Sequence, residues 1–290
     1  MQTEDVTIIG AGPAGIAVAI QLKRYGLDPV LLEKDHAGGL LVNANLVENY
    51  PGFPRGISGV KLVQLFQLQL ERTRVATSLE EVTQLDYDHS FILKTSKREL
   101  RSRIVVIASG TRPRQAEFPP EAADRVFYEV SSLAGVDHKK IVIIGAGDAA
   151  FDYALNLSRM NEVTILNRKK ERKCLPLLWE RTQKTPRITY IDNAALQAIK
   201  SSGEELTISY KNPRGDWELG VDYVIFAIGR KAQLGYLSER LKAQATDLEE
   251  SGLLYFVGDV KNDIYRQTSI AVGDGVRAAM KICRKFQGVD

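Results

Sequence analysis

The chain has 290 residues, of which 44% are hydrophobic and 26% charged, and its formal net charge is +3. This composition is typical of a globular protein of about two domains, and so small a net charge excludes nucleic acid or a membrane surface as the main partner. No apolar run approaches the roughly 20 residues that span a bilayer, and acidic residues precede the first apolar run, so we expect no secretory signal and a cytoplasmic location.

The first predicted elements form one βαβ unit around a glycine-rich turn. Val6–Ile9 is a short β-branched run, and after the turn a helical period of apolar residues extends to about Tyr25. A second strand, Pro29–Leu32, ends at Glu33. Further along, Val63–Leu70 has the apolar spacing of an amphipathic core helix.

The glycines of this turn have separate tasks in binding a dinucleotide. Gly10 permits a tight bend, Gly12 lets a pyrophosphate approach the backbone, and Gly15 lets helix and strand pack closely. The helix N-terminus presents free N–H groups to the phosphates, and Glu33 stands where a carboxylate binds the hydroxyls of an adenosine ribose. The predicted contacts are Gly10, Gly12, Pro13, Ala14, Gly15 and Glu33. The alternative is a purely structural glycine turn.

A second unit of the same kind begins 135 positions after the first, counted from Val6 to Ile141. Ile141–Ile144 is its strand, a helix follows the turn to about Met160, and Val163–Leu166 is its second strand. This spacing indicates two separate mononucleotide-binding domains rather than a short repeat.

The second unit differs where a nucleotide is selected. Its turn has Gly145, Gly147 and, in the third position, Ala150; its second strand is followed by Asn167, Arg168 and Lys169. A carboxylate there would repel a 2′-phosphate, whereas an uncharged residue beside cations attracts one. We therefore predict that these six residues bind NADPH, in preference to NADH. The alternative is that the basic run is a solvated loop.

Other apolar runs indicate further strands. Three of them end in glycine, as buried strands of an α/β sheet do near their ligands: Ile104–Ile107, Val224–Ala227 and Leu253–Val257. Ile188–Ile191 and Leu206–Tyr210, with the turn that follows, are predicted to form a small antiparallel excursion.

With these motifs assembled, the chain resembles the low-molecular-weight thioredoxin reductase family almost from end to end. The segments that carry the resemblance are GAGPAG, EKDHAGGL, VENYPGFP, ASGTRPR, IGAGDAA, YFVGDV and RQTSIAVGDGVRAA, in that family's order. The resemblance implies an α/β fold of two Rossmann-like three-layer nucleotide-binding domains, with the NAD(P)H domain (114–231) inserted into the FAD domain (1–113 and 232–290). It also implies a homodimer.

The resemblance adds FAD contacts to those of the first turn. They map to Gly39, Leu40, Asn49, Gly258, Asp259, Arg266, Gln267 and Thr268. Leu40 departs from the family, which has glutamine after the paired glycines. In flavoproteins of this type an aspartate at position 259 hydrogen-bonds the ribityl chain; on spacing alone Asp259 is equally explained as a turn residue.

The main departure concerns the family's redox-active CxxC. The corresponding positions are Glu129 and Ser132, neither of which can form a disulfide. The two cysteines, Cys174 and Cys283, are far apart and form no CxxC pair and no four-ligand zinc cluster. Thioredoxin reduction through the usual dithiol relay is therefore excluded, and we predict no metal site and no catalytic side chain.

The sequence thus predicts an FAD-dependent NAD(P)H oxidoreductase, in which hydride passes from nicotinamide C4 to flavin N5 and electrons then pass to an unidentified acceptor. Thioredoxin-reductase-like ferredoxin–NADP reductases are similar in lacking the cysteine pair and in the segment Tyr128–Val130, but they carry an extra C-terminal aromatic segment. A ferredoxin-linked electron-transfer module, with or without a working NADP site, is therefore one alternative. A non-catalytic flavin-binding protein is another. Hinges are expected near Arg112–Pro113 and Gly229–Arg230.

Overall fold

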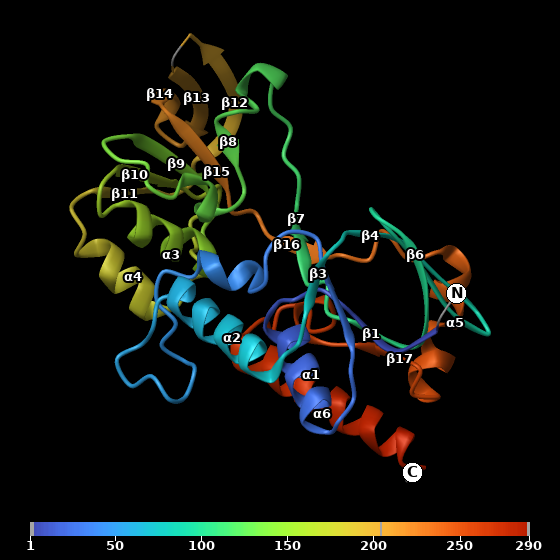
Figure 1. Ribbon diagram of the computed structural model, residues 1–290. Coiled ribbons are helices and arrows are strands. Elements are labelled where there is room, and N and C mark those ends of the chain that lie inside the picture. The colour runs from blue at the N-terminus through green and yellow to red at the C-terminus, as the bar shows by residue number, and fades with distance from the viewer. Residues whose placement is uncertain (1–2, 204, 289–290) are drawn as a thin grey trace. The chain divides into compact units, whose positions relative to one another are not determined.

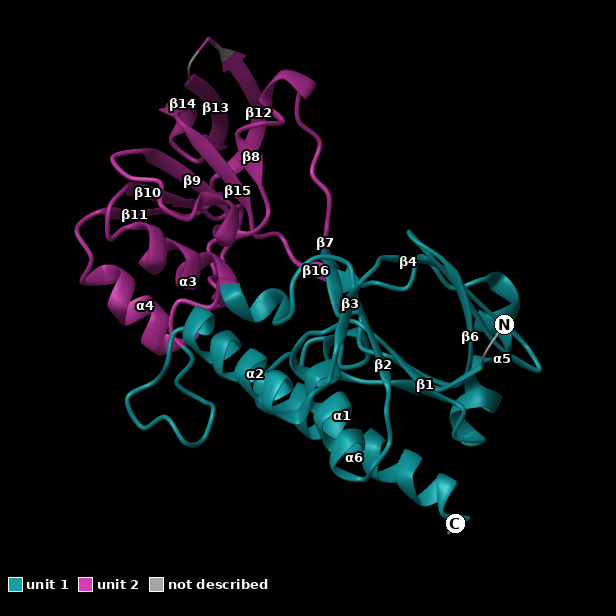
Figure 2. Cartoon of the chain, in the orientation of Figure 1, with its two compact units in different colours: residues 1–42, 47–112, 231–290 teal, residues 43–46, 113–230 magenta. Residues whose placement is uncertain are grey.

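The computed structural model describes residues 3–203 and 205–288, which form two compact units (Figures 1 and 2). Unit 1 comprises residues 1–42, 47–112 and 231–290, and unit 2 comprises residues 43–46 and 113–230. The boundaries of the large segments lie one residue before those expected from the sequence. No sequence signal indicated that residues 43–46 would belong to unit 2.

Unit 1 is built on a mixed sheet. Its parallel part has the order β3-β2-β1-β6-β17, and the antiparallel strands β5 and β4 continue from the N-terminal half of β6. The strands are β1 (Thr3–Ile9), β2 (Val30–Glu33), β3 (Thr77–Leu79), β4 (Val82–Asp88), β5 (Ser90–Thr95), β6 (Glu99–Ile107) and β17 (Leu254–Phe256). The parallel register places Ile9, Leu32 and Ile107 at one edge, where the connecting turns begin.

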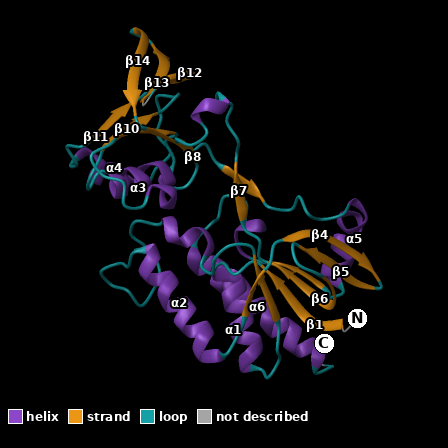
Figure 3. Cartoon of the chain, turned by 45° about the horizontal axis from the view of Figure 1, so that its top comes forward, coloured by secondary structure: helices purple, strands orange, loops and turns teal. Residues whose placement is uncertain are grey.

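The helices of unit 1 include the predicted amphipathic helix and the helix after the first glycine turn. They are α1 (Pro13–Arg24), α2 (Gly59–Thr73), α5 (Glu239–Glu250) and α6 (Thr268–Phe286), with short 3₁₀ turns η1 (Gly39–Asn43) and η4 (Gly258–Val260). Helices α1 and α6 lie side by side in Figures 1 and 3. The absence of a side chain at Gly275 of α6 permits their close packing, since a Cβ built there would lie 2.4 Å from the carbonyl oxygen of Ala14.

Unit 2 has three layers: a parallel sheet, a small antiparallel sheet on one face, and helices on the other. The parallel order is β11-β10-β9-β15-β8; the strands are β8 (Val126–Phe127), β9 (Lys140–Ile144), β10 (Glu162–Leu166), β11 (Ile188–Ile191) and β15 (Tyr223–Phe226). The antiparallel strands are β12 (Ala195–Ser202), β13 (Glu205–Asn212) and β14 (Gly215–Val221), and the helical elements are α3 (Asp148–Leu157), α4 (Pro176–Gln183), η2 (Pro120–Ala122) and η3 (Val130–Leu133).

The predicted antiparallel excursion was therefore wrong in one of its strands. Ile188–Ile191 pairs in parallel with β10, and the antiparallel sheet consists of β12, β13 and β14, with its turn between Asn212 and Gly215. One core cluster lies between the parallel sheet and this small sheet, and another lies under α3 and α4.

The chain connects the units through a two-stranded ribbon. It consists of β7 (Thr111–Pro113) and β16 (Arg230–Ala232), and it is closed by hydrogen bonds from Arg114 N to Gly229 O and from Gln233 N to Gly110 O. Among the residues that the structure describes, no helix is long and apolar enough to cross a membrane.

Candidate nucleotide-binding sites

The first glycine turn in unit 1 has the geometry that its spacing predicted. Gly10 has φ of +103°, and a Cβ there would lie 2.5 Å from the carbonyl oxygen of Ala108, so a side chain is excluded twice over. At Gly15 a Cβ would lie 1.9 Å from the oxygen of Gly10. Gly12, by contrast, has no atom within 4 Å of its built Cβ. The turn is thus closely packed at Gly10 and Gly15 and open at Gly12, where a pyrophosphate would approach.

Glu33 is attached directly to this turn. Its Oε2 accepts a hydrogen bond of 2.7 Å from Ala11 N, and its Oε1 accepts from Lys34 N and Asp35 N at 2.9 and 3.2 Å. An ionised carboxylate has about four acceptor positions, so three backbone donors fix its orientation and leave capacity for a ligand hydroxyl.

Two distant segments of unit 1 reach the same turn. A Cβ built at Gly39 would lie 3.3 Å from Gly12 Cα, and one at Gly258 would lie 2.8 Å from Ala14 Cβ. Asp259 follows Gly258 in η4. Gly10–Gly15, Glu33, Gly39 and the Gly258–Asp259 turn are therefore gathered at the N-terminus of α1, where no side chain caps the helix.

The remaining predicted FAD contacts form a second group. Asn49 Nδ2 donates to Gln267 Oε1 at 2.7 Å, next to the N-terminus of α6 at Thr268. Arg266 Nε is buried and has no hydrogen-bond partner in the structure, which is unusual unless a bound group accepts from it. Leu40 lies in η1, directly after Gly39. The open Gly12, the uncapped helix and the unpaired Nε all fit a bound FAD.

The second glycine turn, in unit 2, repeats the first. Gly145 has φ of +140°, and its built Cβ would lie 2.3 Å from the oxygen of Ala227, whereas Gly147 has no atom within 4 Å. Ala150 is fully buried in α3, whose N-terminus has no side-chain cap. The turn therefore fits a second pyrophosphate.

The basic loop after β10 is held against this turn. Lys173 N donates to Ala146 O at 2.8 Å, and Leu175 N donates to Asp148 Oδ1 at 2.8 Å. Arg168 and Lys169 are exposed, and none of the ion pairs among the described residues involves them. Their charges are therefore available to an anion bound at the turn.

The side chain of Asn167 is directed into its own loop, whereas a contact to a ribose would require it to face the nucleotide. It is 5% exposed, its Nδ2 donates to Glu171 O and to the hydroxyl of Tyr190, and its Oδ1 accepts from Lys169 N. The amide is thus engaged within its own loop.

Glu129, where the family's cysteines stand, is part of a polar cluster within unit 2. Its carboxylate accepts from Asn43 Nδ2 and from the Tyr153 hydroxyl, both at 3.0 Å, and pairs with the Arg230 guanidinium. Asn43 Oδ1 in turn accepts from Ser131 N at 3.0 Å. Burial, followed by the negative charge of Glu129, raises the pKa of Tyr153. Sequence reasoning missed Asn43 and Arg230, which lie far from Glu129 along the chain.

The two cysteines do not take over this position. Cys174 precedes α4 and packs against the core under α3, and burial raises the pKa of its thiol. It is therefore a poorer nucleophile than a solvent-exposed cysteine. Cys283 is buried in α6 of unit 1.

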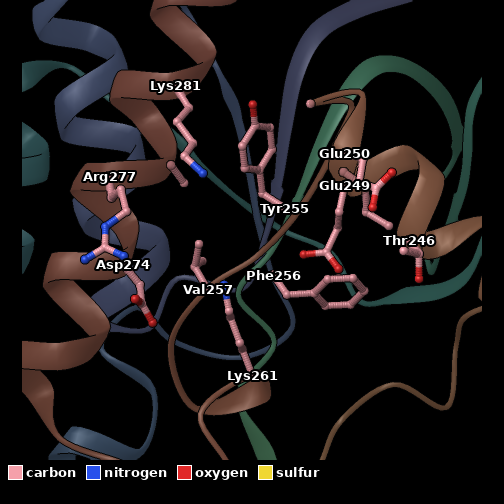
Figure 4. A pocket seen from close by; sticks show the side chains of 13 residues that line it. Thr246, Glu249, Glu250, Tyr255, Phe256, Val257, Lys261, Asp274, Arg277 and Lys281 are labelled. Carbon is pink, nitrogen blue, oxygen red and sulfur yellow. The ribbon is translucent and has the colours of Figure 1, made fainter.

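A separate hollow of about 460 Å³ lies in unit 1, lined by α5, β17 and α6. Figure 4 shows Glu249 and Glu250 on one side of it and Arg277 and Lys281 on the other. None of the predicted cofactor contacts lines it, so it is distinct from the site at the glycine turn.

Comparison with known proteins agrees with this geometry. Residues 4–275 match the pyridine nucleotide-disulphide oxidoreductase family. The thioredoxin reductase of Treponema pallidum is 31% identical and the alignment covers 96% of each chain; that of Chlamydia pneumoniae is 29% identical over 94% of this chain and 96% of the relative. The Lactococcus lactis thioredoxin reductase structure, in its FR conformation, aligns with a TM-score of 0.86 at 28% identity, covering 99% of this chain and 100% of that one.

The fold and the two turns define an α/β oxidoreductase with two Rossmann-like domains. The chain belongs to the pyridine nucleotide-disulphide oxidoreductase family and is thioredoxin reductase-like within it. It is therefore an FAD-dependent NAD(P)H oxidoreductase, and its cofactors are FAD and NADPH. The predicted fold class, enzyme class and cofactors are confirmed.

Proposed function

We propose that this chain transfers electrons from NADPH through FAD to an acceptor that it reduces without any dithiol of its own. When bound, FAD accepts a hydride from NADPH and passes the electrons on. The remaining contributions come from the chain: it binds both nucleotides, separates them between two units, and contains no thiol pair.

The observation that carries the proposal is the cluster around Glu129. A carboxylate that accepts three hydrogen bonds, one of them from a guanidinium, is held in one orientation. It can neither form a disulfide nor accept a pair of electrons. The two cysteines lie 109 positions apart, from Cys174 to Cys283, and belong to different units.

In this proposal unit 1 binds FAD and unit 2 binds NADPH. The contacts to FAD are the residues gathered at the α1 N-terminus, together with Leu40, Asn49, Arg266, Gln267 and Thr268. The contacts to NADPH are Gly145, Gly147 and Ala150 for the pyrophosphate, and the exposed cations Arg168 and Lys169 for the 2′-phosphate. A homodimer and a cytoplasmic location are also part of the proposal, and the homodimer rests on the resemblance alone.

The test begins with anaerobic mixing of the FAD-loaded protein with NADPH or NADH, followed by flavin absorbance. We expect rapid bleaching by NADPH and much slower bleaching by NADH. The reduced protein is then offered ferricyanide, ferredoxin, or thioredoxin with a thiol indicator. Turnover with the first two, and none with thioredoxin, is the expected pattern.

Cysteine variants provide the matched control. Cys174→Ser and Cys283→Ala should leave turnover with ferricyanide or ferredoxin unchanged. Thioredoxin reduction that disappears in Cys174→Ser would contradict the proposal, because it would require a thiol relay. Absence of bleaching by both nucleotides, with reduction by ferredoxin alone, would show that the second nucleotide site does not work.

A further inference from the structure

The basic loop of unit 2 is anchored at Asn167 more firmly than a solvated charged loop requires. Both N–H groups of the Asn167 amide are used, in hydrogen bonds of 3.0 Å to Glu171 O and 2.9 Å to the Tyr190 hydroxyl. The amide oxygen accepts from Lys169 N at 3.1 Å. With the side chain only 5% exposed, these are bonds in a poorly solvated place, where leaving a donor unpaired is costly.

The backbone of the loop is pinned at the end of β11. Asn167 N donates to Ile191 O at 2.9 Å, Ala194 N donates to Asn167 O at 2.8 Å, and Asn193 N donates to Lys169 O at 3.1 Å. The far end of the loop is held by the bond from Lys173 N to the glycine turn. The loop that carries the cations is therefore held by backbone hydrogen bonds at both of its ends.

Tyr190 links Asn167 to a group of aromatic rings, the aromatic shelf, which consists of Phe151, Trp179 and Tyr190. The rings of Trp179 and Tyr190 are 5.1 Å apart, and each lies about 6 Å from that of Phe151, which is fully buried. The guanidinium of Arg172 lies over the Trp179 ring, 4.3 Å from its centre. Arg172 and Asn167 therefore both contact the aromatic shelf, through Trp179 and Tyr190 respectively.

We propose that Asn167 and Tyr190 are positioning residues that set the selectivity for a 2′-phosphate. They do not contact the nucleotide. They hold the backbone of residues 167–171 on the aromatic shelf, and this keeps Arg168, Lys169 and Arg172 in place around one anion. Preorganised cations bind a phosphate more tightly than cations on a loop that must first be ordered. The inference rests on the proposed assignment of NADPH to unit 2.

The test compares two probes that differ in the 2′-phosphate, 2′,5′-ADP and 5′-AMP, by calorimetric titration of the FAD-loaded protein. Tyr190→Phe keeps the ring on the shelf and removes only the hydroxyl, so we expect about 3- to 10-fold weaker binding of 2′,5′-ADP, the value of one hydrogen bond. Asn167→Ala removes three bonds and should weaken 2′,5′-ADP more than Tyr190→Phe does. Binding of 5′-AMP should change less than about 2-fold in both variants. Tyr210→Phe, in the other core cluster of unit 2, is the matched control and should change neither.

The outcomes separate this inference from the function on which it rests. Equal affinity of the unmodified protein for the two probes would overturn the NADPH assignment and the inference with it. A preference for 2′,5′-ADP that persists unchanged in Asn167→Ala and Tyr190→Phe would overturn the inference alone. Equal weakening of both probes would also overturn it, because it would indicate general damage to unit 2.

Discussion

The two glycine turns share one backbone arrangement although they lie in different units. Gly10 N donates to Leu32 O, one residue before Glu33, at 2.8 Å. Gly145 N donates to Leu166 O, one residue before Asn167, at 3.0 Å. The next carbonyls, of Ala11 and Ala146, each accept from a loop that folds over the turn, at 2.7 and 2.8 Å. The pattern of strand, turn and helix thus dictates the same local frame twice.

The difference lies in the side chain at the end of the second strand, which is Glu33, the last residue of β2, in unit 1 and Asn167, directly after β10, in unit 2. Glu33 extends back to the turn and bonds Ala11 N, whereas Asn167 extends away from the turn, to its own loop and to Tyr190. In the proposal, Glu33 of unit 1 is part of the nucleotide site, whereas Asn167 of unit 2 supports a set of cations. We therefore expect the backbone of each turn to select for a pyrophosphate and the residue at the end of the second strand to select the nucleotide.

The third position of the turn, Gly15 in unit 1 and Ala150 in unit 2, should show the largest effect of a substitution. Gly15→Ala would place a Cβ 1.9 Å from the oxygen of Gly10, a clash between backbone atoms that no rotamer can relieve. We expect a loss of more than about 3 kcal/mol in the stability of unit 1 and a protein that does not retain FAD. Thermal unfolding and the ratio of flavin to protein absorbance after gel filtration measure both.

The matched change in unit 2 is Ala150→Gly, which removes a buried methyl group and lowers helix propensity. It should cost about 1–2 kcal/mol and leave FAD bound. Retention of FAD by Gly15→Ala, with the unfolding temperature unchanged, would show that the first turn is looser than the structure has it.

The middle glycines test the open face of each turn. Gly12 and Gly147 have extended backbones and empty space around the built Cβ, so alanine should leave the stability of the protein without nucleotides unchanged. A methyl group would nevertheless occupy the place of the pyrophosphate. We expect about 100-fold weaker FAD binding in Gly12→Ala and about 100-fold weaker NADPH binding in Gly147→Ala, the value of one to two charge-assisted hydrogen bonds.

Each of these variants is the control of the other. Equilibrium titration of the apoprotein with FAD, and of the FAD-loaded protein with NADPH, should show only the cognate loss. Weakening of both nucleotides by either substitution would contradict the assignment of one nucleotide to each unit.

The residues directly after Asn167 and Glu33 test a smaller, electrostatic contribution to nucleotide affinity. Arg168→Glu should weaken NADPH binding about 10- to 30-fold, because one favourable phosphate interaction becomes a repulsion, and it should leave NADH nearly unchanged. Lys34→Glu, which alters the corresponding position after Glu33, should affect neither. The loss in Arg168→Glu should shrink with added salt; a loss that is equal for NADPH and NADH would place the 2′-phosphate elsewhere.

Much of this comparison was predictable from the sequence because it is local. The glycine spacing, the strand before each turn and the residue after each second strand lie within about 30 positions of one another. The one strand placed wrongly, Ile188–Ile191, is a short apolar run, and such a run does not reveal whether its partner will be parallel or antiparallel.

What could not be predicted depends on partners that are distant in the sequence. The cluster of Glu129, Asn43 and Arg230 joins residues 86 and 101 positions apart. The orientation of Asn167 is decided by a hydroxyl 23 positions away. No pattern of residue types signals such contacts, and they require the folded chain.

The same dependence on distant partners gives two acidic residues opposite properties. In unit 1, hydrogen bonds from Arg240 and Ser238 lower the pKa of Asp86 to about 2. In unit 2, burial raises the pKa of Asp152 to about 6, although the carboxylate accepts a 2.8 Å bond from Asn45 N. Asp152 thereby holds the segment 43–46 on unit 2 while carrying a charge that is poorly solvated.

Asp152→Asn gives the smallest and last of the expected effects. The folded chain binds the Asp152 proton more tightly than the unfolded chain does, since its pKa rises from 3.8 to about 6. Its contribution to stability is therefore fully present below about pH 4 and is lost as the pH rises through about 6. Replacement by asparagine, which still accepts from Asn45 N, should remove this dependence and raise the free energy of unfolding at pH 7.5 by about 1 kcal/mol.

Urea unfolding at pH 5 and pH 7.5 measures the dependence, with Asp86→Asn as the control from unit 1. That control should lower stability at both values, because the contribution of Asp86 is lost only as the pH falls from about 4 towards 2. If Asp152→Asn were less stable than the unmodified protein at pH 7.5, the charge of Asp152 would contribute more to its bond with Asn45 than its burial costs.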